Sequence, residues 1–445
     1  MPIGALAGAA CVAALWFGYE SKAATLPPTA GVPGTPAATA QAEDASSPAR
    51  VLAMASPGGT SPVDVEVRAA QEWVKRLPRS SDKLIELGRA WVMKARHSAD
   101  PGFYLNAQAC ADLAVEIDPK SRLAKELSAQ VLLNQHRFAE AKDRCEQVLA
   151  EDPDAFITLG VYSDTLLELG RIDEAIAAAD RMGDFKPNLA SYVRASHLQW
   201  LRNDMDGALK SAKLAIEASV DHTQPEPRAY AMVQTANMFW HRGDYEGADA
   251  GYKKALSSFT DYPSALVGRG RVALAQGDAK AAVDFFRAAD KQSPLCETAW
   301  RLGDACAAMG DDACSVDAYA KVVERGRKED ARTLAAFYAA KNRDIDEALR
   351  LSAKEMENRP GIHTQDIRAW VLYRAGRVAE AKQLITQAVR FGTPDAQLVY
   401  HHGAILIAAG DKEGGAKLVK KALELNPRFD PTGAPEAAKL LESTK

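Results

Sequence analysis

The sequence predicts an all-α protein that forms a right-handed superhelical solenoid of stacked helix hairpins. Three observations support this prediction. Alanine is abundant, while aromatic residues make up only 7% of the 445 residues, and alanine favours helices over strands. The chain is too long for one compact domain unless the fold is elongated or repetitive. Short glycine-containing turns recur at a nearly constant spacing, which is typical of helical repeats.

Residues 1–22 are predicted to be an export signal or a membrane anchor. Residues 3–18 carry no charge, and Trp16 and Tyr19 lie at the end of this run, as aromatic residues do near a membrane interface. The run is short for a spanning helix, which needs about 20 apolar residues, but long enough for the core of a signal peptide. No Lys or Arg precedes it, so the usual positive flank is missing.

Residues 23–63 are rich in Pro, Ala and Thr, which predicts a disordered tether. This order of segments is typical of a protein that is exported and is periplasmic or tethered to the cell membrane, with membrane contact only through the N-terminal segment. The alternative is a cytoplasmic protein. The net charge of −4 and pI of 6.1 argue against nucleic acid as the main partner.

Residues 64–445 are predicted to be the solenoid, because several sequence columns repeat with a period of about 34 residues. A glycine marks the turn of many units, and a small residue follows five positions after each turn. The turn glycines are Gly170, Gly243, Gly277, Gly310, Gly376 and Gly410. The small residues are Ala141, Ala175, Ala208, Ala248, Ala282, Ser315, Ala348, Ala381 and Gly415. An insertion is expected at residues 220–227, and a C-terminal capping helix at residues 435–442.

This pattern resembles the tetratricopeptide repeat (TPR) family over about residues 84–430, with about nine clear units and a degenerate first one. Leu266, Gly270, Ala273, Ala282 and Phe286 match one unit of the family pattern. The resemblance implies two antiparallel helices per unit, A and B, and a concave groove lined by A helices.

The stretch Gly268-Arg269-Gly270-Arg271-Val272-Ala273 also matches the G-x-G-x-x-A fingerprint of dinucleotide-binding turns. Such a turn must follow a buried strand, but Pro263-Ser264 indicates a helix start instead. In the repeat alignment, Gly270 is the small residue of an A helix beside a helix B backbone, and Gly268 faces solvent. No cofactor is expected.

Groove-facing residues are expected at fixed positions of successive A helices. A mixture of aromatic and charged side chains there suits an extended peptide or a partner helix. Ordinary packing is the alternative role for the tryptophans. The predicted set is Asp164, His197, Trp200, Asn237, Trp240, Arg271, Trp300, Asp304, Phe337, Asp366, Trp370, Tyr373 and Tyr400.

The sequence offers little for other chemistry. Asn237 has Val233 rather than Lys four residues earlier, so the clamp by which some TPR domains bind an acidic chaperone tail is not expected. His401 and His402 are adjacent and would point about 100° apart on a helix, which disfavours a shared metal. No catalytic motif occurs, so no catalytic, metal or cofactor site is predicted. Cys306 and Cys314 are either buried packing residues or a disulfide, if the compartment is oxidising.

The sequence therefore predicts a protein-binding scaffold that presents a concave groove to a protein or peptide and has no enzymatic activity. A small-ligand-binding or regulatory domain associated with an enzyme is one alternative, which a pocket closed by residues 220–227 would favour. A cytoplasmic assembly factor is the other. The sequence sets neither the partner nor the oligomeric state.

Overall fold

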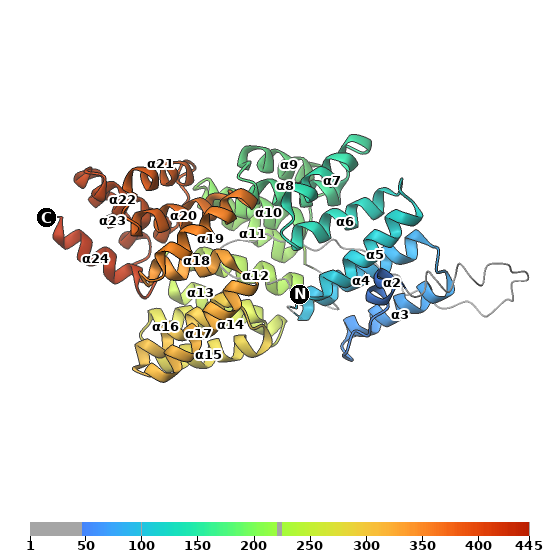
Figure 1. The fold of residues 1–445 in the computed structure, drawn as a ribbon, viewed down its shortest axis with the longest axis horizontal. Helices are drawn as coiled ribbons and strands as arrows, with labels where there is room; N and C mark the ends of the chain where they lie inside the picture. The colour runs from blue at the N-terminus through green and yellow to red at the C-terminus, as the bar shows by residue number, and fades with distance from the viewer. Residues whose placement is uncertain (1–46, 99, 220–224, 445) are drawn as a thin grey trace, which may run out of the picture.

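The computed structural model describes residues 47–98, 100–219 and 225–444, and within these ranges it contains 23 helices and no strand (Figure 1). The predicted all-α solenoid is confirmed. The predicted N-terminal export segment and residues 220–224 of the predicted insertion lie outside the described ranges. None of the described helices has both the length and the apolar character that a membrane span requires.

Ten antiparallel helix pairs form the body of the molecule, each with an A helix followed by a B helix. The pairs are α4 (Ser81–Ser98) with α5 (Phe103–Ile117), α6 (Arg122–Asn134) with α7 (Phe138–Glu151), α8 (Phe156–Glu168) with α9 (Ile172–Phe185), α10 (Leu189–Leu201) with α11 (Met205–Glu217), α12 (Pro225–His241) with α13 (Tyr245–Ser258), α14 (Pro263–Ala275) with α15 (Ala279–Gln292), α16 (Cys296–Met309) with α17 (Asp312–Lys328), α18 (Ala331–Ala340) with α19 (Ile345–Asn358), α20 (Ile362–Arg374) with α21 (Val378–Ala388), and α22 (Ala396–Ala408) with α23 (Lys412–Leu425). Two helices, α2 (Pro48–Ala53) and α3 (Pro62–Arg76), precede the first pair, and α24 (Gly433–Ser443) follows the last.

Most turns inside a pair place a residue in the left-handed backbone region. Gly243 has φ 70°, which glycine adopts without the steric cost of a side chain. The next residue, Asp244, accepts a hydrogen bond from the backbone N–H of Gly247 at 2.9 Å and so caps α13. Asn203 and Asp204 do the same for α11, with φ 64° at Asn203. These turns explain the glycine column of the repeat.

The column of small residues is buried where the two helices of each pair cross. Ala282 and Ala381 have no exposed surface. At the last pair, a Cβ atom on Gly403 would lie 2.8 Å from the carbonyl oxygen of Gly415, so both helices need small residues there.

The two glycines of the dinucleotide-like motif lie inside α14, where no phosphate-binding turn exists. A Cβ atom on Gly270 would lie 2.6 Å from the ring of Phe286 in α15, so the close neighbour is a side chain rather than a backbone. The expectation that Gly268 faces solvent is wrong. Gly268 is buried, and a Cβ atom there would lie 2.4 Å from the ring of Tyr252.

The folded part begins earlier than predicted. Residues 48–53, placed by the sequence in the tether of residues 23–63, form α2 and dock on the first pair. Trp91 donates a hydrogen bond to the Ala53 carbonyl at 2.9 Å, and Asn106 donates to the Leu52 carbonyl at 2.7 Å. The predicted boundary was wrong because composition indicates disorder only on average. Here the buried side chains of Trp91 and Asn106 supply hydrogen bonds to the last carbonyl groups of α2.

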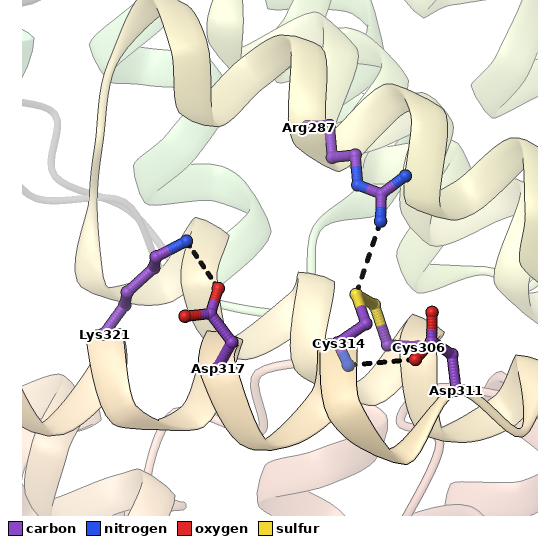
Figure 2. Close-up of a disulfide and its surroundings, with 6 residues drawn as sticks. All are labelled: Arg287, Cys306, Asp311, Cys314, Asp317 and Lys321. Atoms are coloured by element: carbon purple, nitrogen blue, oxygen red, sulfur yellow. Dashed lines mark hydrogen bonds and ion pairs between the residues drawn. A yellow bond between two sulfur atoms is a disulfide. The ribbon is translucent and has the colours of Figure 1, made fainter.

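Cys306 and Cys314 form a disulfide, so the second alternative for these residues holds (Figure 2). Their Cα atoms lie 5.7 Å apart, on α16 and α17. Asp311, between them, accepts a hydrogen bond from the backbone N–H of Cys314 at 3.0 Å. The bridge therefore ties the two helices of one pair next to their turn.

Consecutive turns of the superhelix touch each other. Asn358 donates to the His136 carbonyl at 3.2 Å, Thr393 to the Leu201 carbonyl at 2.7 Å, and Asn426 to the Trp240 carbonyl at 2.8 Å. In each case the carbonyl lies within two residues of the end of an A helix, and the donor lies at the end of a B helix or in the loop that follows it. The partners are 186 to 222 residues apart in sequence. These hydrogen bonds join one turn of the superhelix to the next.

Candidate interaction surface

The predicted groove residues lie on the A helices α8, α10, α12, α14, α16, α18, α20 and α22. Nine are buried, namely Asp164, His197, Trp200, Trp240, Trp300, Asp304, Phe337, Trp370 and Tyr400. Four are half-buried, namely Asn237, Arg271, Asp366 and Tyr373. The expectation of an open groove lined by these side chains therefore needs correction. Neighbouring A helices and later parts of the chain cover most of them.

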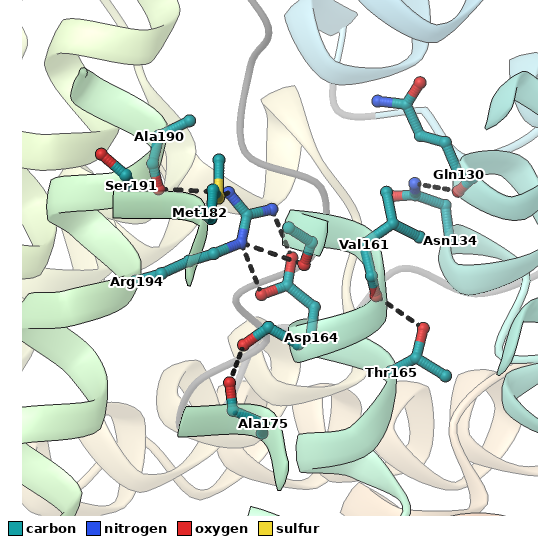
Figure 3. A network of polar contacts seen from close by, with 12 residues as sticks. Gln130, Asn134, Val161, Asp164, Thr165, Ala175, Met182, Ala190, Ser191 and Arg194 are labelled. Carbon is teal, nitrogen blue, oxygen red and sulfur yellow. Dashed lines mark hydrogen bonds and ion pairs between the residues drawn. The ribbon is translucent and has the colours of Figure 1, made fainter. Parts of the chain in front are cut away.

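Asp164 belongs to a buried ion pair that joins α8 to α10 (Figure 3). Arg194 donates to both carboxylate oxygens, at 3.0 and 2.6 Å, and also to the carbonyls of Gly160 and Ala190, each at 3.1 Å. Burial raises the pKa of Asp164, and the guanidinium of Arg194 opposes the rise. This pair holds two repeats together and offers no free group to a partner.

A cluster of histidine and tryptophan rings fills the interior beside this pair. The ring centroid of Trp200 lies 5.7 Å from that of His197 and 4.7 Å from that of His241. His241 Nδ1 is 3.4 Å from an oxygen of Asp395, which lies one superhelical turn later. Burial lowers the pKa of His197 to about 3, helped by nearby His363. Buried imidazole is thus neutral at physiological pH.

Asn237 and Arg271 serve neighbouring helices. Tyr252 donates its hydroxyl to the Asn237 side chain at 2.7 Å. The guanidinium carbon of Arg271 lies 4.3 Å from the ring centroid of Trp240, a cation–π distance. Both side chains keep part of their surface accessible.

Trp300, Asp304 and Phe337 form the next group. The rings of Trp300 and Phe337 meet edge to face at 5.5 Å. Asp304 is bound by Lys341 at 2.6 Å and by the hydroxyl of Tyr319 at 2.7 Å. Burial raises the pKa of Asp304, and the charge of Lys341 opposes that rise.

The C-terminal repeats hold the densest aromatic group. His401 stacks on Trp370 with centroids 4.0 Å apart, and its Nδ1 lies 2.8 Å from the carboxylate of Asp366. Tyr373 stacks on Trp370 at 4.7 Å. A small hollow lies beside Trp370 and Tyr400, with room for about one water molecule.

One segment of the chain, residues 426–436, crosses the interior face of six A helices in turn; we call it the C-terminal segment. It begins with the hydrogen bond from Asn426 to α12 described above. The next contacts follow the chain. Arg428 donates to the Ala275 carbonyl at the end of α14, Asp430 accepts from Arg301 of α16 at 3.2 Å, and Thr432 accepts from Lys341 after α18 at 3.1 Å.

The last contact of the C-terminal segment is with α20 and α22. Glu436 accepts from Arg374 at 2.6 Å and from the hydroxyl of Tyr400 at 3.2 Å. The role of this segment was not predicted, because residues 426–432 lie between α23 and α24 and their partners lie in earlier repeats. The roles of Arg194, Arg301, Lys341 and Arg374 were not predicted either. The only sequence signal was Phe429, a large apolar residue in a stretch otherwise typical of a loop.

The described part of the chain contains no cluster of three or more His, Cys, Asp or Glu side chains arranged to hold a metal ion. The interior groups that the structure brings together are aromatic rings and paired charges. Such groups can bind a complementary surface.

Family models for the tetratricopeptide repeat match residues 132–196, 233–295 and 368–433. These three matches agree with the period of the sequence. A comparison with curated proteins finds no match.

Several solved structures resemble the fold. PilW, described as a widely conserved type IV pilus biogenesis factor, is 16% identical with a TM-score of 0.39, over 48% of this chain and 97% of PilW. A tetratricopeptide repeat protein from Parabacteroides merdae is 20% identical with a TM-score of 0.34, over 57% and 98%. Human IFIT1, solved as a dimer with m7Gppp-AAAA, is 15% identical with a TM-score of 0.47, over 82% and 91%.

Proposed function

Because the chain belongs to the tetratricopeptide repeat family, we propose that it is a non-catalytic scaffold whose concave face binds a protein or peptide. The observation that carries this proposal is the row of aromatic and charged side chains on successive A helices. Asn237, Arg271, Asp366 and Tyr373 are the members with accessible surface, so first contact with a partner falls to them. The buried aromatic residues behind them supply a rigid base.

Site-specific photo-crosslinking in native cells tests this proposal. A benzophenone amino acid replaces Tyr373, which is half-buried on the concave face. The matched control replaces Val316 of α17, a B-helix residue that is 69% exposed. We expect one saturable protein adduct at position 373 and none at 316. Equal adducts at both positions, or none at 373, would contradict concave-face binding.

We also propose that the protein is exported and acts at the cell envelope, tethered to the membrane or free in the periplasm. The apolar run of residues 3–18 and the Cys306–Cys314 disulfide support this proposal, because disulfides persist in oxidising compartments. Fractionation with thiol trapping tests it. A soluble cytoplasmic protein whose Cys306 and Cys314 are both alkylated without reduction would favour the cytoplasmic alternative.

A second candidate is a small-ligand or regulatory domain that works with an enzyme, and its ligand would have to widen the hollow beside Trp370. The lining of this hollow combines aromatic rings with Arg374 and Glu436, and the hollow lies in the last repeats. A thermal-shift screen would support this candidate if a compound raised Tm in the parent chain and not in a Trp370→Leu variant. No shift with any compound would count against it.

A further inference from the structure

The C-terminal segment lies on the concave face in the way a bound peptide would. In the described part of the chain, every hydrogen bond that joins it to the six A helices uses at least one side chain. Residues 426–432 have no regular secondary structure, and residues 433–436 form the first turn of α24. Side-chain recognition of this kind can be reproduced by another chain that carries the same groups.

Two adjacent residues anchor the segment. Phe429 is 7% exposed, lines the hollow beside Trp370 and lies 5.7 Å from the ring of Tyr400. Asp430 is 8% exposed and accepts hydrogen bonds from Arg301 and from the backbone N–H groups of Thr432 and Gly433, the last two at 2.9 and 2.7 Å. An aromatic ring followed by a carboxylate is thus the chemistry that this part of the groove selects.

The charge of the groove agrees with that choice. Arg301 and Arg374 each donate to a carboxylate of the C-terminal segment, that of Asp430 and that of Glu436. Lys341, which is already paired with Asp304, donates to the neutral hydroxyl of Thr432. Burial tends to raise the pKa of Asp430, but Arg301 and the two backbone N–H groups outweigh it, so the pKa lies below its usual value. The site therefore binds the ionised carboxylate.

We propose that residues 426–436 are an internal ligand, and that the partner of the concave face is a protein segment with an aromatic residue followed by an acidic one, which displaces them. This inference rests on the proposed scaffold function. The partner's aromatic ring takes the place of Phe429, and its carboxylate takes the place of Asp430 against Arg301. Until it binds, the internal ligand occupies the groove, and the apparent affinity is the intrinsic affinity multiplied by the fraction of open molecules.

A labelled peptide with the sequence of residues 426–436 tests the proposal by fluorescence anisotropy with the full chain. The first variant, Phe429→Ala with Asp430→Ala, weakens the internal ligand and leaves the groove intact. We expect this variant to bind the peptide at least 10-fold more tightly than the parent chain does. Adding Arg301→Met should reduce that binding at least 10-fold, and a peptide with Ala at both anchor positions should not bind.

Two results would overturn the proposal. One is a folded double variant that binds the peptide no better than the parent. The other is loss of helicity in the double variant, which would make residues 426–436 a constitutive cap. Hydrogen exchange on the parent chain is an independent measurement: excess peptide should speed exchange at the amides of Thr432 and Gly433, and unchanged exchange would count against displacement. Crosslinking at position 373 with no peptide binding would leave the scaffold function standing and remove only the internal ligand.

Discussion

Replacing Arg194 with Met tests whether the buried ion pair holds the third and fourth repeats together. The side chains of Arg194 and Asp164 are 1% and 3% exposed. The substitution keeps an unbranched apolar stem and removes the hydrogen bonds to two carboxylate oxygens and two carbonyls. Removal of one partner from a buried pair costs about 3–5 kcal/mol, since the remaining charge is left without compensation. We expect a loss of stability of that size.

The loss should also depend on pH. Without Arg194, burial raises the pKa of Asp164 further, so the folded variant takes up a proton that the unfolded chain binds only near its lower, ordinary pKa. A carboxyl whose pKa is higher in the folded state stabilises that state at low pH. This stabilisation is lost as pH rises from the pKa of the unfolded chain to the pKa of the folded protein. Burial already raises the pKa of Asp164 to about 7 in the parent, so the stability of the variant relative to the parent should fall as pH rises above 7, by at most about 1.4 kcal/mol per pH unit.

Urea unfolding followed by circular dichroism measures the loss, and hydrogen exchange in α8 and α10 locates it. The control is Arg181→Met, because Arg181 pairs with Asp154 at a similar 2.7 Å while both side chains are more than half exposed. Exposed pairs contribute about 0–1 kcal/mol. Equal losses in the two variants, or a loss at Arg194 that does not change with pH, would refute the reasoning.

Three further predictions concern the helices and the interior. Burial lowers the pKa of His197 to about 3, so the unfolded chain binds a proton first as pH falls; stability should drop by about 2 kcal/mol between pH 6.5 and pH 5, and urea titrations of the parent and His197→Phe should differ over that range. Gly403→Ala should lower Tm because its Cβ meets backbone, whereas Gly183→Ala in α9, with open space around it, should raise stability by about 0.5–1 kcal/mol; equal shifts would contradict this packing. Replacement of Cys306 and Cys314 by Ala should lower the free energy of unfolding by about 2–3 kcal/mol. An unchanged urea unfolding curve would contradict a stabilising bridge.

The sequence was sufficient for the features that repeat locally. The turn glycines, the buried column that includes Ala282 and Ala381, and the assignment of Gly270 to a helix follow from contacts between neighbouring helices. Those contacts recur every 34 residues, so several columns of one sequence report them.

The environment of the predicted groove residues could not be predicted in the same way. Trp200 lies beside His241 and, through it, near Asp395 because many small rotations between repeats add up to a closed turn. No single unit encodes that sum. The C-terminal segment adds a second difficulty, because Asp430 finds its partner Arg301 in α16, three repeats before the last one.

The contacts between consecutive turns have a mechanical consequence. An ordinary solenoid behaves like an extensible spring, because each unit touches only its neighbours and can unfold nearly independently. Here Asn358, Thr393 and Asn426 fasten one coil of the spring to the next. Stretching must therefore break contacts between residues about 190 positions or more apart, and such non-local contacts slow folding and join distant units into one cooperative transition. In a force-extension experiment this protein should resist elongation and then yield in large steps, whereas an open solenoid would unwind repeat by repeat.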